Sequence, residues 1–194
     1  MKKNLTIAFW FTIVTTVIFG ILYPLAVTGL AQLLFPHQAN GQLLENNGKI
    51  IGSRIIGQSF TAPGYFHSRP SSAGTGYDAT SSSASNLAPT NRTLIDRVKE
   101  DVEKAHAENP SSPVPIDLVT ASGSGLDPEI SPAAAEFQSA RVAKERNMSK
   151  EEVEALIQKH TRPRQFGFLG EPGINVLELN LELDHSYPIP QTRH

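Results

Sequence analysis

The sequence contains no cysteine, and its 194 residues include a single tryptophan and two methionines. The lack of cysteine excludes a disulfide framework, a thiolate zinc site and a cysteine nucleophile. Excess positive charge is also missing, because 17 Lys and Arg against 19 Asp and Glu give a formal net charge of -2. Such a chain has no basic surface that could neutralise a polyanion, so we expect no nucleic-acid partner.

Charged residues are absent from a whole segment near the N-terminus. No Asp, Glu, Lys or Arg occurs from Asn4 to Leu44, and the apolar part exceeds the roughly 20 residues that cross a bilayer. A cleaved signal peptide is the alternative, but its apolar region is only about 7 to 15 residues long. We therefore predict a retained transmembrane helix and stalk over residues 5–35.

The basic residues around this segment predict its orientation. Lys2 and Lys3 precede the span, and the next basic residue is Lys49, well beyond it. The positive-inside rule then places residues 1–4 in the cytoplasm and residues 36–194 outside the cell (inner) membrane, as a single-pass protein. Pro24 is expected to kink the helix where it emerges.

Small or weakly polar residues recur every four positions along the span, and they form a candidate contact ridge for another membrane helix. The ridge consists of Thr12, Thr16, Gly20, Pro24 and Thr28. The alternative is that threonine and glycine are simply common in membrane helices.

Three helices are predicted beyond the span. An amphipathic pattern covers Thr93–Ala107, and Ser131 before Pro132 indicates an N-cap for a helix over Pro132–Arg146. Ser149 and Glu152 form a capping box that opens a third helix. The expected inward-facing residues of the second and third helices are Ala133, Ala134, Phe137 and Ala140, and Val153, Leu156 and Ile157.

Three short strands are predicted as well, which makes the outer domain α+β. Gly48–Phe60 suggests a strand or hairpin with Ile50, Ile51, Ile55 and Ile56 buried, and Ile116–Val119 suggests a brief buried strand. Leucine alternates with polar residues over Leu177–Asp184, which is typical of a strand with one buried face. Between them, Ser68–Asn91 is either flexible or an ordered loop held by side-chain hydrogen bonds.

Patterns that indicate catalysis are scarce. Ser122 and Ser124 lie in a glycine turn without the spacing of a nucleophile elbow. A structural role for this turn is therefore favoured over a catalytic one, and the alternative function is a membrane-anchored extracytoplasmic serine hydrolase. The histidines show no metal-ligand spacing, and the paired carboxylates are those of solvated helix surfaces. We expect no catalytic or metal-binding residue in this chain, the pattern assigns no residue to cofactor binding, and interaction is the default function.

Several segments together resemble one family, the C subunit of the Kdp-type potassium-transporting P-type ATPase. The resemblance runs nearly end to end. It is carried by IGQSF (56–60), YFHSRPS (65–71), SNLAPTN (85–91), DLVTASGSGLDPEISPAAA (117–135), QSARVAKERN (138–147) and LGEPGINVLELNLELD (169–184). Ala88 and Glu129 depart from the residues expected at those positions, which are glycine and histidine.

The resemblance implies a non-catalytic companion in a potassium pump. A channel-like potassium-binding subunit and an ATP-hydrolysing subunit are the implied partners, and members of the family are described as catalytic chaperones that raise the ATP affinity of the hydrolysing subunit. The resemblance thus implies ATP as a ligand of the complex. The predicted topology conflicts with direct contact, since only about four residues would reach the cytoplasm, and it favours a domain over the outer mouth of the channel-like subunit.

Overall fold

The computed structural model describes residues 1–46 and 48–189. The chain divides into two compact units, residues 1–51 and the residues from 52 onward. Each unit is described by itself.

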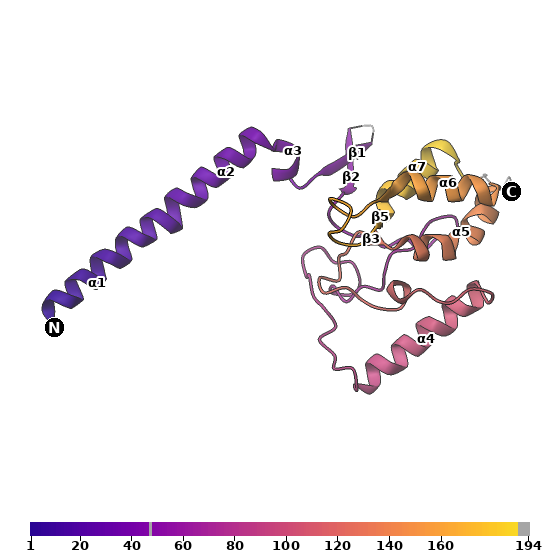
Figure 1. Ribbon diagram of the computed structural model, residues 1–194, viewed down its shortest axis with the longest axis horizontal. Coiled ribbons are helices and arrows are strands. Elements are labelled where there is room, and N and C mark those ends of the chain that lie inside the picture. The colour runs from indigo at the N-terminus through magenta and orange to yellow at the C-terminus, as the bar shows by residue number, and fades with distance from the viewer. Residues whose placement is uncertain (47, 190–194) are drawn as a thin grey trace. The chain divides into compact units, whose positions relative to one another are not determined.

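The first unit is dominated by one long apolar helix. It comprises α1 (Lys2–Thr15), a π-helical stretch η1 (Thr16–Leu22) and α2 (Tyr23–Leu34), and it is the indigo rod in Figure 1. The 33 residues are long and apolar enough to cross a membrane, and none of them is buried. A surface of exposed apolar side chains along the whole helix suits a lipid environment.

The π-helical stretch ends just before Pro24, where the sequence predicts a disturbance. Proline has no N–H and its ring crowds the carbonyl of the residue four positions earlier, which is Gly20. The backbone N–H of Tyr23 instead bonds the carbonyl of Ile18, five residues back. The helix therefore widens before the proline and continues through it.

A short turn and a hairpin complete the first unit. Helix α3 (Pro36–Ala39) leads to β1 (Leu43–Asn46) and β2 (Lys49–Ser53), which form a two-stranded sheet. The strand alternative predicted within Gly48–Phe60 is confirmed by β2, whose hairpin partner β1 precedes the predicted range. The predicted burial is wrong for Ile50 and Ile55, which are exposed. A two-stranded ribbon has no third layer to cover its apolar face.

The second unit is an α+β domain built on a small antiparallel sheet. The strands β3 (Glu129–Ile130), β4 (Thr161–Arg162) and β5 (Gly173–Asn175) lie in the order β3-β5-β4, with Ile174 paired to both Ile130 and Thr161. Helices α5 (Pro132–Arg146), α6 (Lys150–His160) and α7 (Val176–Ser186) gather around it (Figure 1). Their shared core consists of Phe66, Ile130, Ala134, Ala135, Val142, Ala143, Val153, Leu156, Ile157, Ile174, Val176, Leu179 and Leu183.

The predicted boundaries of α5 and the predicted start of α6 are confirmed. The hydroxyl of Ser131 accepts a hydrogen bond from the Ala134 N–H at 3.1 Å, and both bonds of the Ser149 and Glu152 capping box are present. The predicted inner face of α5 is partly wrong, because Ala133 and Ala140 are exposed. Polar and charged side chains occupy much of the face that is buried, which apolar periodicity could not reveal.

The strand predicted over Leu177–Asp184 is wrong, because this segment is helix α7. Asn175 caps the helix by accepting from the Glu178 N–H at 3.1 Å. The buried residues are Val176, Leu177, Leu179, Asn180 and Leu183, a helical spacing that an alternation of leucine and polar residues also permits. Leucine and glutamate are strong helix formers, and the segment lacks the β-branched residues typical of strands.

Two further segments differ from expectation in detail. Ile116–Leu118 is a 3-10 helix, η2, and the predicted strand is wrong. Helix α4 (Arg92–Glu108) confirms the predicted helix, and Asn91 caps it, but none of its residues is fully buried. Its C-terminal end is tied to α5, because Glu108 pairs with Arg141 at 2.8 Å and the Asn109 amide donates to the Phe137 carbonyl at 3.0 Å.

Amide side chains hold the irregular segment that precedes α4. Asn180 accepts from the Phe66 N–H and donates to the Phe66 carbonyl, both at 2.9 Å. Gln138 likewise accepts from the His67 N–H at 2.8 Å and donates to the His67 carbonyl at 3.1 Å. Each amide thus supplies the donor and acceptor that a neighbouring strand would supply, and buried backbone polar groups require such partners.

We predict that Gln138→Leu lowers the free energy of unfolding by about 2 kcal/mol, because it leaves the N–H and carbonyl of His67 without their partner. The measurement is urea denaturation of the full chain in mild detergent, read by pulse proteolysis. Gln158→Leu, on the exposed face of α6, is the matched control and changes stability by less than about 0.5 kcal/mol. Equal losses of stability in the two variants would contradict the role of Gln138 as the backbone partner of His67.

Candidate functional site

The segments that carry the family resemblance meet one another inside the second unit. Arg146 of α5 is the centre of one such meeting, and its side chain is fully buried. Its guanidinium donates to the Gly64 carbonyl at 2.6 Å, to the Tyr187 carbonyl at 2.7 Å and to Asp184 at 2.9 Å. It also lies 4.7 Å from the ring centre of Tyr65, so the buried charge is paired and its donors are used.

A second meeting point surrounds Gly125 in the turn between η2 and β3. The hydroxyl of Ser71 donates to the Gly125 carbonyl at 2.6 Å and accepts from the Tyr77 N–H at 2.8 Å. Gly125 has φ +68°, and a Cβ there would come within 2.6 Å of the Ala73 nitrogen. These contacts favour the ordered alternative for Ser68–Asn91, and Gly125 is needed for close backbone approach as well as for its conformation.

The same turn contains the two candidate nucleophilic serines. The hydroxyl of Ser124 accepts from the Leu126 N–H at 3.1 Å and lies 3.4 Å from the Ser122 hydroxyl. Among the described residues, neither hydroxyl has a histidine or carboxylate partner that could act as a general base. The contacts are those of a structural turn, and they give no support to the hydrolase alternative.

A groove of about 520 Å³, lined by both charged and apolar residues, lies on the surface of the domain. Its walls are formed by η2, by β3 and the start of α5, and by β4 together with residues 171–173 at the start of β5. The charged residues that line it are Arg69, Asp117, Asp127, Glu129, Arg162 and Glu171, and the apolar ones include Pro115, Ile116, Ile130 and Pro172.

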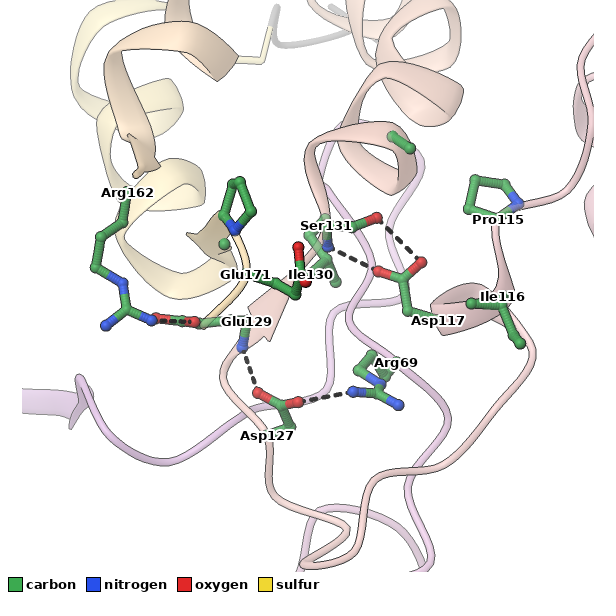
Figure 2. Close-up of a pocket in the computed structure, with 13 residues that line it drawn as sticks. Arg69, Pro115, Ile116, Asp117, Asp127, Glu129, Ile130, Ser131, Arg162 and Glu171 are labelled. Atoms are coloured by element: carbon green, nitrogen blue, oxygen red, sulfur yellow. Dashed lines mark hydrogen bonds and ion pairs between the residues drawn. The ribbon is translucent and has the colours of Figure 1, made fainter. Parts of the chain in front are cut away.

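Hydrogen bonds fix the charged groups of the groove (Figure 2). Asp127 accepts from Arg69 at 2.9 Å and from the Glu129 N–H at 3.0 Å, and Arg162 pairs with Glu129 at 2.7 Å. Asp117 accepts from the Ser131 N–H at 2.7 Å and from its hydroxyl at 3.1 Å, beside the N-terminus of α5 where a negative charge is favourable. Four carboxylates therefore line the groove together with two guanidinium groups.

The titration behaviour of nearby groups follows from burial. Burial and the charge of Arg141 lower the pKa of His67 below its ordinary value of 6.5. Burial raises the pKa of Tyr77, whose hydroxyl donates to the Arg69 carbonyl. Both side chains are therefore held in their neutral forms near pH 7, and within the described residues no cluster of three His, Asp or Glu side chains suits a metal ion.

The predicted contact ridge lies entirely on the apolar helix. Thr12 belongs to α1, Thr16 and Gly20 to η1, and Pro24 and Thr28 to α2, and all five are exposed. In an α-helix a four-residue spacing drifts by about 40° per repeat, and the wider turns of the π-helical stretch oppose this drift. The ridge stays a prediction, because the structure contains the chain alone.

Sequence reasoning identified the segments of the site but missed how their residues pair. Tyr65 with Asp184, Arg69 with Asp127 and Asp117 with Ser131 are pairs from different segments. No local pattern marks such partners, because the residues of a pair are separated by 14 to 119 positions. The one available signal was their position within the segments quoted for the family resemblance.

Comparisons with known proteins agree on one family. The family described as "K+-transporting ATPase, c chain" matches residues 5–185. The chain is 58% identical over 193 residues, covering 100% of both chains, to the potassium-transporting ATPase KdpC subunit of Koribacter versatilis. It is 57% identical to the KdpC subunit of Rhodospirillum rubrum, covering 90% of this chain and 91% of that one, and 55% identical to that of Acidobacterium capsulatum, covering 95% and 100%.

The fold and the comparisons together define a class of protein, a transporter subunit with one candidate membrane helix among the described residues and a small α+β domain. Potassium transport is the activity of the complexes to which its relatives are assigned by name. The chain belongs to the KdpC family.

We predict that acid weakens the domain through two histidines. Burial lowers the pKa of His67 and of His160 below 6.5, and the buried Nε2 of His160 has no hydrogen-bond partner among the described residues. As the pH falls below about 6.5, the unfolded chain binds protons that the folded chain does not, so the free energy of unfolding decreases. The decrease from pH 7.5 to 5.5 is expected to be smaller in a His67→Gln, His160→Gln variant.

Urea midpoints of the full chain at several pH values measure this effect. His106→Gln, an exposed substitution on α4, controls for loss of a histidine as such. Identical pH slopes in the wild type and the double variant would show that other groups carry the acid sensitivity.

Proposed function

We propose that this chain is a non-catalytic accessory subunit of an ATP-driven potassium uptake complex. The observation that carries the proposal is the apolar helix Lys2–Leu34, in which no side chain is buried by the rest of the chain. A helix that only anchored a domain would not need a ridge of small residues. A helix that packs against partner helices needs one for close approach.

The roles of the subunits in the proposed complex follow from the motifs and the membrane span of this chain. A P-type ATPase requires the aspartate of a DKTGT motif, which the sequence does not contain. Residues 1–46 and 48–189 contain one candidate span, which is too few to line an ion pathway. ATP hydrolysis and ion passage are therefore assigned to partner chains, namely a P-type hydrolysing subunit and a channel-like potassium-binding subunit.

The proposed topology sets the role of the α+β domain. Lys2 and Lys3 keep the N-terminus in the cytoplasm of a cell (inner) membrane, and the domain is extracytoplasmic. There it docks on the outer face of the channel-like subunit and holds the complex together. Any effect on ATP affinity is indirect coupling through the complex, since nucleotide is on the opposite side of the membrane.

The ridge offers a direct test of assembly. Gly20→Leu adds bulk where a partner helix would approach, and a Cβ at Gly20 meets only Thr16 at 3.7 Å within this chain, so the isolated helix tolerates the change. We expect it to reduce the partner subunits that copurify with the tagged chain from detergent by about fivefold or more. Ala26→Leu is the control, because Ala26 lies about 200° around the helix from both Pro24 and Thr28.

Normal recovery of both partners with Gly20→Leu would show that the ridge is not part of the interface. A complex that assembles and imports potassium normally after deletion of the whole chain would contradict the accessory role itself.

The topology is tested with single cysteines, because the natural chain has none. We expect a membrane-impermeant maleimide to label Ala107→Cys, an exposed position of α4, in intact spheroplasts. Asn4→Cys, which keeps both lysines, is expected to react only after the membrane is permeabilised. The reverse pattern would place the domain in the cytoplasm and reopen direct contact with ATP.

A further inference from the structure

The connection between β4 and β5 presents two phenylalanines to solvent. Phe166 is 87% exposed, Phe168 70% and the neighbouring Leu169 47%. We call residues 163–171 the aromatic tip. Isolated exposed apolar residues are common on protein surfaces, but adjacent exposed aromatic side chains on one loop mark an interaction site.

The aromatic tip is held in place by hydrogen bonds. Gln165 and Leu169 exchange two backbone bonds of 2.9 Å, and the Phe168 N–H donates to the Gln165 carbonyl at 3.2 Å. At the base, Arg164 donates to the Gly170 carbonyl at 2.8 Å and pairs with Glu171 at 2.5 Å. A loop fixed in this way loses little conformational freedom on binding, which favours a preformed anchor.

The backbone at Phe166 supports the same conclusion. Phe166 and Gly167 have φ values of +52° and +81°, as in the mirror-image turns of β-hairpins. Asparagine, aspartate and glycine are the residues that adopt this conformation with least strain, and a bulky residue there is an outlier. A phenylalanine that is both strained and exposed contributes little to the stability of its own domain.

The aromatic tip is continuous with the groove. Arg162, which precedes the tip, and Glu171, its last residue, also line the groove, and so does Ile116, which is 75% exposed. Among the described residues, Arg162 pairs with Glu129 and Arg164 with Glu171. The bonds of Asp117 go to neutral groups of Ser131, so the groove retains negative charge beside an apolar surface.

We propose that the aromatic tip and the groove together dock an extracytoplasmic loop of a multispan membrane subunit. The phenyl rings of Phe166 and Phe168 enter an apolar pocket of that subunit, and a lysine or arginine of its loop lies in the groove near Asp117. This inference rests on the proposed function, since it requires the domain to be extracytoplasmic and to share a complex with a multispan chain.

The charges favour a protein over a lipid surface. Anionic head groups attract unpaired Lys and Arg side chains, but both arginines at the base of the tip are paired with glutamates. The carboxylates of the groove would repel the same head groups. A membrane helix in the same chain raises the effective concentration of the tip at a partner in the same complex, so a small anchor suffices.

The test is a double variant, Phe166→Asn with Phe168→Ser, in the full chain coexpressed with its partner subunits. Asparagine suits the positive φ at position 166, so the urea midpoint of the purified variant is expected to stay at or above that of the wild type. The multispan subunit that copurifies is expected to fall by about tenfold, as for truncation of an interface anchor. Ile95→Gln, which removes an exposed apolar residue from α4, is the control and leaves recovery unchanged.

A photoreactive amino acid at position 166 identifies the occupant. We expect crosslinking to an extracytoplasmic loop of the multispan subunit, and none from position 95. Adducts with lipid alone, or undiminished recovery in the double variant, would overturn the proposal. If that recovery is undiminished while deletion of the whole chain still abolishes the complex, the docking site is wrong and the accessory role stands.

Discussion

The domain depends on two amide side chains that replace a missing β-strand. Phe66 is the largest fully buried side chain of the core, yet it belongs to a segment with no helix or strand of its own. Its backbone N–H and carbonyl could remain in the interior only with partners, because an unpaired buried polar group costs roughly 1 to 3 kcal/mol. Asn180 supplies both partners from α7, and Gln138 does the same for His67 from α5. The two helices and the irregular segment are therefore positioned by one set of bonds.

This arrangement shows how the segments that carry the family resemblance are held against one another. Their polar residues are used on one another: Arg146 with Asp184 and Tyr65, Arg69 with Asp127, and Asp117 with Ser131. A buried guanidinium that donates to two carbonyls and a carboxylate fixes three parts of the chain, and loss of one partner from such a network is costly. What remains for interaction is the surface that these bonds support, above all the groove and the aromatic tip.

The two units divide the work of a membrane subunit between different physical environments. The helix from Lys2 to Leu34 exposes apolar side chains along its whole length and satisfies its backbone internally, as hydrocarbon demands. Where Pro24 removes a donor, a π-helical stretch absorbs the change without ending the helix. The domain instead places its apolar side chains around a three-stranded sheet. In the part of it that the structure describes, the exposed phenylalanines are those of the aromatic tip.

The sequence by itself determined the features that depend on local interactions. The apolar span follows from a run of residues without charge. The N-terminal starts of α5 and α6 follow from Ser131, Pro132 and the capping box, because N-caps act over three or four residues. Only the tertiary structure decided the state of Leu177–Asp184, since alternating leucines suit either a strand or a helix until a neighbouring surface selects one. It also decided the amide hydrogen bonds to Phe66 and His67 and the ion pairs, whose partners lie up to 124 positions apart. Such pairs form because the chain folds back on itself, and no local pattern records which residues will then meet.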